Sequence, residues 1–151
     1  MKVVALLLLV MALFVAIYPQ FFTCQSHGFA IKLPKFTIPM KCLYTAHAQM
    51  SLAIMVAIAA IGLWFLREKE TRTILSILGI VGGFLILMTV TRAPGVGIGI
   101  CVNPDMPCVI YMRPAIYTVA PLIIAASTVG LVMNLVTFKP GKLREKGSSK
   151  R

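Results

Sequence analysis

Four long apolar runs constrain this chain more than any other feature. They cover residues 3–18, 46–66, 73–91 and 115–138. Each approaches or passes the roughly 20 residues that a membrane-spanning helix needs. Because lipid offers the backbone no hydrogen bonds, such a run must satisfy its own polar groups as a helix. The sequence therefore predicts an all-α fold, an integral membrane four-helix bundle over residues 1–138, followed by a basic, disordered tail over residues 139–151.

The composition excludes an ordinary soluble domain. Hydrophobic residues make up 59% of the 151, and there are four acidic side chains. Soluble domains are about 45–50% apolar and about 25% charged. The formal charge of +11 would suit nucleic acid, but the basic residues flank the apolar runs. We therefore expect a lipid bilayer as the main partner and no nucleic acid.

The basic residues also predict the orientation in the plasma membrane, because Lys and Arg are enriched in cytoplasmic segments. With both termini cytoplasmic, the larger share of the 15 basic residues lies inside. The inner set is Lys2, Arg67, Lys69, Arg72, Lys139, Lys142, Arg144, Lys146, Lys150 and Arg151, and the outer set is Lys32, Lys35, Lys41, Arg92 and Arg113. Two loops, at about residues 19–45 and 92–114, should then face outward.

The first apolar run has a second interpretation. A basic start followed by a 16-residue apolar stretch also describes a signal peptide. The following sequence, YPQFFT, lacks the small residues of a cleavage site. An uncleaved helix is favoured, and cleavage stays open.

Both outer loops carry a cysteine pair, Cys24 with Cys42 and Cys101 with Cys108. The exterior is an oxidising compartment, so two even pairs suggest two disulfide-bearing extracytoplasmic loops. Four cysteines allow three connectivities. One bond within each loop is simplest, and pairing across the loops is the rival.

Two further hypotheses concern the same residues. The cysteines could perform thiol–disulfide chemistry with a quinone, as in four-helix disulfide oxidases, although the typical C-x-x-C spacing is missing. Alternatively, Cys, Met and His side chains could bind a soft, copper-like metal at the outer end of the bundle. The candidates for such a redox or metal site are Cys24, His27, Met40, Cys42, His47, Met106 and Cys108.

Smaller patterns predict local structure. Alternating apolar residues on both sides of Pro34-Lys35 indicate a short hairpin. Thr45 is a plausible N-cap of the second helix, and Asp105 a turn cap. Small residues four apart should pack helices together or bind a partner helix, in this chain or a second copy. These are Gly79, Gly83, Ala126 and Gly130.

The stretches MKCLYTAHAQ (residues 40–49) and GICVNPDMPC (residues 99–108), with Arg113-Pro114, resemble a family of small four-helix prokaryotic membrane proteins catalogued only as a domain of unknown function. Where that family often has an acid, this chain has Gln49, and Leu43 replaces a polar residue. The resemblance implies an accessory subunit beside an ABC-type export permease. It implies no reaction.

We therefore expect a non-enzymatic accessory or binding protein with no cofactor. Metal and quinone enter under the two alternative hypotheses alone.

Overall fold

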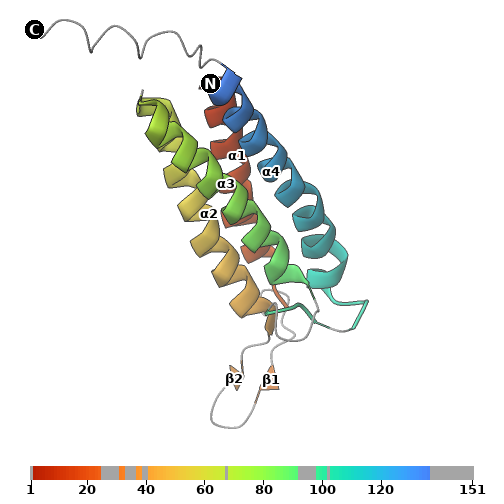
Figure 1. Cartoon of the computed structure of the whole chain (residues 1–151). Helices are drawn as coiled ribbons and strands as arrows, with labels where there is room; N and C mark the ends of the chain where they lie inside the picture. The colour runs from red at the N-terminus through yellow and green to blue at the C-terminus, as the bar shows by residue number, and fades with distance from the viewer. Residues whose placement is uncertain are drawn as a thin grey trace, which may run out of the picture.

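The computed structural model describes residues 2–24, 31–32, 37–38, 41–66, 68–91, 98–101 and 103–136. Four long helices form the bundle of Figure 1: α1 (Lys2–Phe21), α2 (Lys41–Phe65), α3 (Lys69–Val90) and α4 (Arg113–Val136), which continues a one-turn π-helix, η1 (Cys108–Met112). Each spanning unit is long and apolar enough to cross a membrane. The prediction of an all-α, four-helix architecture is confirmed.

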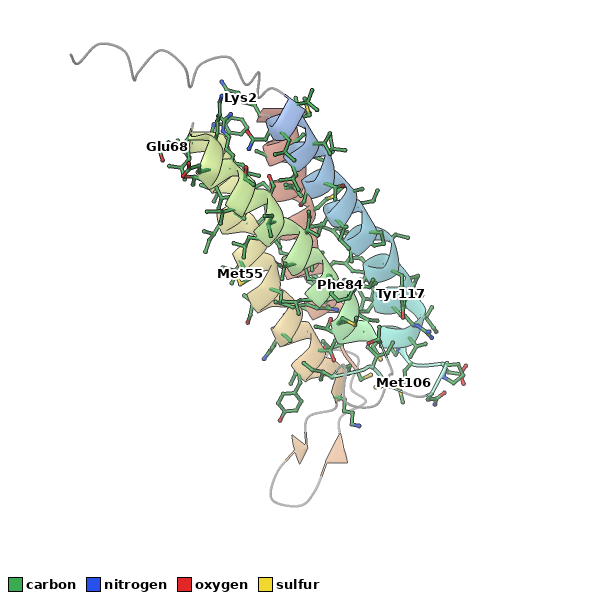
Figure 2. All side chains as sticks on the ribbon, in the orientation of Figure 1. Lys2, Met55, Glu68, Phe84, Met106 and Tyr117 are labelled. Carbon is green, nitrogen blue, oxygen red and sulfur yellow. The ribbon has the colours of Figure 1, made fainter. Side chains whose placement is uncertain are left out.

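The helices alternate in direction, so the bundle has two distinct ends (Figure 1). At one end α1 and α3 finish and α2 and η1 begin, and this is called the cysteine end. Lys2 and Glu68 lie at the opposite end, and Met106 lies at the cysteine end (Figure 2). The main packing pairs are α1 with α2, α2 with α3 and α3 with α4, and α1 also contacts α4.

The core is a narrow stripe along each helix. On α1 the buried residues are Ala5, Leu8, Ala12, Val15 and Pro19, spaced alternately three and four apart. This spacing is the seam of a helix that packs against neighbours on one side. Large apolar side chains such as Val10 (59% exposed) and Ile58 (61% exposed) cover the outside. An apolar exterior around an apolar core fits a bundle whose surroundings are lipid.

Three helices begin well ahead of the apolar runs. Helix α3 begins at Lys69 rather than at residue 73, and the other two extensions lie at the cysteine end. The run at residue 46 predicted the start of the second helix, but α2 begins at Lys41. Thr45 is therefore inside the helix, and the N-cap interpretation was wrong. Likewise, η1 begins at Cys108, ahead of the apolar run at residue 115. Both extensions contain polar or cysteine residues, so hydropathy gave no sign of them.

A two-stranded antiparallel hairpin projects from the cysteine end (Figure 1). Strand β1 (Ile31–Lys32) pairs with β2 (Thr37–Ile38), with Ile31 opposite Ile38. The predicted hairpin is thus confirmed in its pairing, and its Pro34-Lys35 turn lies outside the described residues. The predicted disordered tail, residues 139–151, also lies outside them.

The contact between α3 and α4 depends on glycines that leave room for the facing helix. A Cβ at Gly79 would lie 2.5 Å from Ser127 Oγ, and one at Gly83 would lie 2.8 Å from Ile124 Cγ1. In turn, Gly130 of α4 faces Ser76 of α3. Gly79, Gly83 and Gly130, which were predicted to pack helices together, are buried. The fourth predicted packing residue, Ala126, is partly buried. Small residues therefore let these two helices approach closely along most of their length.

Asn134 joins the same two helices at the end opposite the cysteines. Its side-chain Nδ2 donates to the carbonyl oxygen of Lys69 at 3.1 Å and to Thr73 Oγ1 at 2.9 Å. Asn134 therefore forms interhelical hydrogen bonds between α3 and α4. Such bonds help to fix the register of α3 against α4.

The glycine contact predicts the effect of adding volume there. Gly83→Leu should destabilise the protein by about 1–3 kcal/mol, because neighbouring Ile123, Ile124 and the Ala120 carbonyl leave no space for the side chain. Thermal unfolding in detergent would measure the change. Val81→Leu is the matched control, since Val81 is 45% exposed on the same helix. Equal unfolding temperatures for the two variants would refute the close α3–α4 contact.

Candidate functional site

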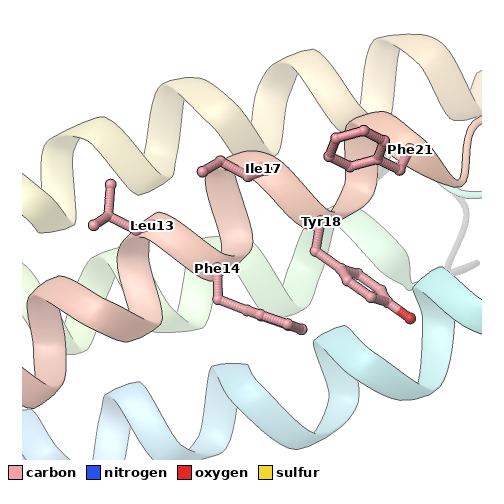
Figure 3. Close-up of a pocket in the computed structure, with 5 residues that line it drawn as sticks. All are labelled: Leu13, Phe14, Ile17, Tyr18 and Phe21. Atoms are coloured by element: carbon pink, nitrogen blue, oxygen red, sulfur yellow. The ribbon is translucent and has the colours of Figure 1, made fainter.

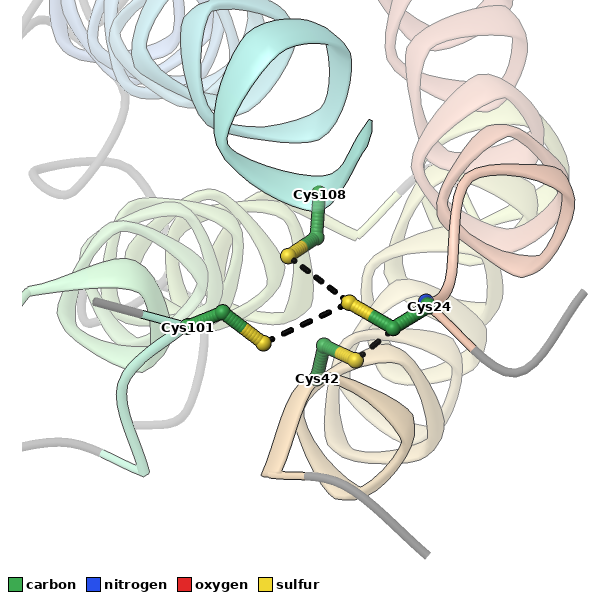
Figure 4. A group of neighbouring side chains, drawn as sticks. All are labelled: Cys24, Cys42, Cys101 and Cys108. Atoms are coloured by element: carbon green, nitrogen blue, oxygen red, sulfur yellow. Dashed lines mark hydrogen bonds between the residues drawn. The ribbon is translucent and has the colours of Figure 1, made fainter. Parts of the chain in front are cut away.

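The four cysteines meet at the cysteine end of the bundle, although they come from separate parts of the chain. Cys24 follows α1, Cys42 lies in the first turn of α2, Cys101 lies in the segment before η1, and Cys108 is the first residue of η1. All four Sγ atoms lie within 4.8 Å of one another. Figure 4 shows the side chains pointing toward a common centre. We call this group the four-sulfur cluster.

Cys24 occupies the central position in the cluster. Its Sγ atom lies 3.3 Å from Cys101 Sγ and 3.3 Å from Cys108 Sγ, and its backbone N–H donates to Cys42 Sγ at 3.4 Å (Figure 4). A disulfide needs an S–S distance of about 2.05 Å. The cysteines are therefore in contact without a disulfide between them. The expected pattern of one separate pair in each loop is replaced by a single group.

Most of the cluster is shielded from solvent. Cys24, Cys42 and Cys108 have no exposed surface, whereas Cys101 is partly exposed. Burial raises the pKa of the Cys24 thiol far above its ordinary range, and hydrogen bonds with Cys108, Cys42 and Cys101 raise it further. At neutral pH the metal-free Cys24 side chain is consequently a neutral thiol, which is a poor nucleophile.

Two helix N-termini converge on the sulfur atoms. Cys42 is the second residue of α2, and Cys108 opens the helical segment that continues into α4. The N-terminus of a helix carries a partial positive charge and unpaired backbone N–H groups. Both helix ends therefore present partial positive charge to the sulfur atoms of the cluster.

A hydrogen-bonded layer beneath the cluster positions the loop that carries Cys101. Thr45 Oγ1 donates to the Gly99 carbonyl at 2.5 Å, and the Gly99 N–H donates to the Thr89 carbonyl at 3.1 Å. Gly99 has a φ of 74°, in the left-handed region that glycine adopts without strain. One glycine thus connects α2, α3 and the Cys101 segment.

Gln49 extends this layer toward the middle of the bundle. Its Nε2 donates to Thr89 Oγ1 at 3.1 Å, and the Thr89 hydroxyl donates to the Ile86 carbonyl at 2.7 Å. Gln49 is fully buried, and its Oε1 atom has no hydrogen-bond partner among the described residues. Beyond Gln49, the buried face of α2 is apolar down to Leu63.

An aromatic ladder fixes Cys24 relative to Cys108. Phe14 stacks on Tyr18 with ring centroids 4.7 Å apart, Tyr18 contacts Phe22 at 4.7 Å, and Phe22 contacts Tyr111 at 5.1 Å. The last contact joins the end of α1 to η1. Because Phe22 lies two residues before Cys24 and Tyr111 three after Cys108, the ladder holds both sulfur-bearing segments together.

The lower part of the ladder borders an open apolar groove of about 280 Å³ on α1 (Figure 3). Its lining residues are Leu13, Phe14, Ile17, Tyr18 and Phe21. These residues offer no thiol, imidazole or carboxylate, and they lie on the exposed face of the helix. Acyl chains suit this surface, and no site chemistry follows from it.

The other predicted ligands are placed differently. His47 is exposed on α2 and does not belong to the sulfur cluster. Met106 is partly buried against the core, next to the segment that begins η1. His27 and Met40 lie outside the described residues. Asp105 was expected to cap a turn, but Asn103 does so instead, because its Oδ1 accepts the Asp105 N–H at 3.1 Å.

Sequence reasoning missed Thr45 and Gly99 as positioning residues. A signal for Thr45 existed, because it lies three residues after Cys42 and so shares its helix face. For Gly99 the sequence offers no comparable signal. Nothing in one sequence distinguishes it from neighbouring Gly95 and Gly97.

The hydrogen bond from Thr45 to Gly99 predicts that loss of the Thr45 hydroxyl lowers stability and loosens the Cys101 segment. Thr45→Val should lower stability by about 1–3 kcal/mol, because it leaves the Gly99 carbonyl without its hydrogen-bond donor. It should also make Cys101 react faster with a thiol reagent, measured together with thermal unfolding. Thr45→Ser keeps the hydroxyl and should resemble the unmodified protein. If the valine and serine variants behaved alike, Thr45 would not position this loop.

Comparison with known proteins identifies a family and no function. A search of curated proteins found no match, and a search of solved structures found none either. The family described as "Domain of unknown function (DUF4418)" matches residues 6–133, which include most or all of each spanning helix and all four cysteines. The earlier resemblance to an uncharacterised family is therefore confirmed, and this chain belongs to the DUF4418 family.

Proposed function

We propose that this DUF4418 protein is a membrane-anchored binding protein that holds one soft metal ion in its four-sulfur cluster. The observation that supports this function best is that the Sγ atoms of Cys24, Cys42, Cys101 and Cys108 all lie within 4.8 Å of one another. Two structural disulfides would need each sulfur to have one close neighbour. A group of four mutually close sulfurs is instead what coordination of a single ion requires.

The distances suit tetrahedral coordination by sulfur. Zinc–sulfur bonds of about 2.3 Å place the sulfurs of a tetrahedral four-cysteine site about 3.8 Å apart. The contacts of 3.3 Å and the upper limit of 4.8 Å bracket that separation. Zinc(II) and copper(I) are the ions that prefer such thiolate ligands. Small shifts of the side chains would complete either geometry.

The surroundings support a closed site rather than a catalytic one. Catalytic metal sites use three protein ligands and keep one position for water or substrate, whereas structural sites fill all four. Here four cysteines are available, and three of them are fully buried. The two helix N-termini offset the negative charge of the thiolates. This arrangement favours a non-enzymatic role.

The distribution of Lys and Arg supports an orientation with the cysteine end outside the cell and both termini in the cytoplasm. A metal centre there would protect the thiols from the oxidising exterior and would tie together the segments before α2 and η1. Assistance to an export permease is a further prediction that follows from the family resemblance alone.

Metal content tests the proposal. The protein is purified in detergent, reduced, freed of metal and then supplied with zinc(II) or copper(I). It should retain one ion per chain after dialysis, as measured by elemental mass spectrometry. Serine at any one of the four cysteine positions should weaken binding strongly, since each supplies one of four ligands. Retention of no ion by fully reduced, folded protein would contradict the proposal.

Two matched variants separate this proposal from the wider set of ligands that the sequence suggested. His47→Ala and Met106→Leu should both leave the stoichiometry and the affinity unchanged, because neither side chain belongs to the cluster of four cysteines. Loss of the ion in either variant would instead favour a mixed site of cysteine with histidine or methionine.

A further inference from the structure

The four-sulfur cluster also contains a route by which a disulfide could move from its surface to its interior. Cys101 is partly exposed, whereas Cys24, Cys42 and Cys108 are fully buried. A dissolved oxidant therefore reaches the Cys101 sulfur first. Cys24 Sγ lies 3.3 Å from Cys101 Sγ, and Cys108 Sγ lies 3.3 Å from Cys24 Sγ (Figure 4).

We propose that the metal-free cluster is a site of oxidative modification, in which a small disulfide oxidises Cys101 and the bond passes through Cys24 to end as a Cys24–Cys108 disulfide. The inference does not rest on the proposed metal function, since it concerns reduced protein without an ion. It predicts a covalent link between the end of α1 and the start of η1, across the two cysteine-bearing segments.

Thiol–disulfide exchange supplies each step without a further reactant. First, the Cys101 sulfur attacks the disulfide RSSR, forms Cys101–S–S–R and releases one RSH, which carries away the Cys101 proton. Next, Cys24 attacks the Cys101 sulfur and gives its proton to the departing RS group, which forms Cys24–Cys101 and releases the second RSH. The contact of 3.3 Å makes this step intramolecular, which offsets the weak nucleophilicity of a neutral thiol. Finally, Cys108 attacks Cys24, and its proton passes to the departing Cys101. In total, two protein thiols are oxidised and RSSR is reduced to two RSH.

The geometry favours Cys108 over Cys42 as the last partner. Cys108 Sγ lies 3.3 Å from Cys24 Sγ, whereas Cys42 Sγ also accepts the Cys24 backbone N–H at 3.4 Å, in addition to its side-chain contact with Cys24. Burial also protects a Cys24–Cys108 bond from reduction, because an attacking thiol needs access to one of the two sulfurs. The partly exposed Cys24–Cys101 bond lacks this protection and is the intermediate.

The experiment uses the full chain in detergent, reduced and metal-free, with glutathione disulfide as the oxidant. Remaining thiols are alkylated at intervals, and the disulfides are mapped by peptide mass spectrometry. The unmodified protein should give Cys24–Cys108 as its first stable disulfide. A first disulfide within either loop, Cys24–Cys42 or Cys101–Cys108, would overturn the proposal, as would absence of any protein disulfide.

Variants test the order of the steps. Cys24→Ser should stop at a glutathione adduct on Cys101, and Cys108→Ser should accumulate Cys24–Cys101. Cys101→Ser should slow oxidation at least tenfold, because the remaining sulfurs are buried. His47→Ala is the control and should form Cys24–Cys108 at the unmodified rate, because His47 is exposed on α2 and lies outside the cluster. An unchanged oxidation rate in Cys101→Ser would contradict the route. If a variant does not fold, the disulfide map of the unmodified chain still tests whether Cys24–Cys108 forms first.

The outcomes remain separate from those of the metal proposal. Reduced protein that binds an ion but never forms Cys24–Cys108 would refute this inference and leave the metal centre intact. Protein that forms Cys24–Cys108 but binds no ion would refute the metal centre and support this inference.

Discussion

The whole structure depends on the inability of a lipid interior to hydrogen-bond with the polypeptide backbone. Four apolar runs can cross such a medium as helices, and successive helices run in opposite directions (Figure 1). This alternation brings the end of α1, the start of α2, the end of α3 and the start of η1 to one end of the bundle (Figure 1). The cysteines attached to these four points thus become neighbours, although Cys24 and Cys108 are 84 residues apart.

Close packing of the helices then brings the cysteine-bearing segments into contact. Glycines on α3 and α4 let these helices approach, and the α1 seam of small and medium apolar residues lets its neighbours do the same. At the cysteine end, the Phe22–Tyr111 contact and the hydrogen bonds of Gly99 set the segments that carry the sulfurs. The cluster is therefore held by rigid elements rather than by loops alone, as a preorganised binding site requires.

Much of the fold could be predicted from the sequence, because hydropathy measures directly what the bilayer selects. The helix starts at Lys41 and Cys108 could not be predicted in this way, because the residues that extend each helix are stabilised by tertiary contacts, such as that of Thr45 with Gly99. The sequence predicted that all four cysteines lie in the two loops at the same end of the bundle. It could not show that they form one group, because that depends on how four helix ends pack together. His47 lies outside the four-sulfur cluster, because helical periodicity turns that residue away from the face of Cys42 and Thr45.

The central claim is that four sulfurs share one ion. X-ray absorption spectroscopy at the metal edge of the zinc-loaded protein tests it most directly, because the spectrum reports the type, number and distance of the ligands. We expect four sulfur ligands at about 2.3 Å and no nitrogen or oxygen ligand. A first shell that contains nitrogen or oxygen, or fewer than four sulfurs, would contradict a closed four-cysteine centre.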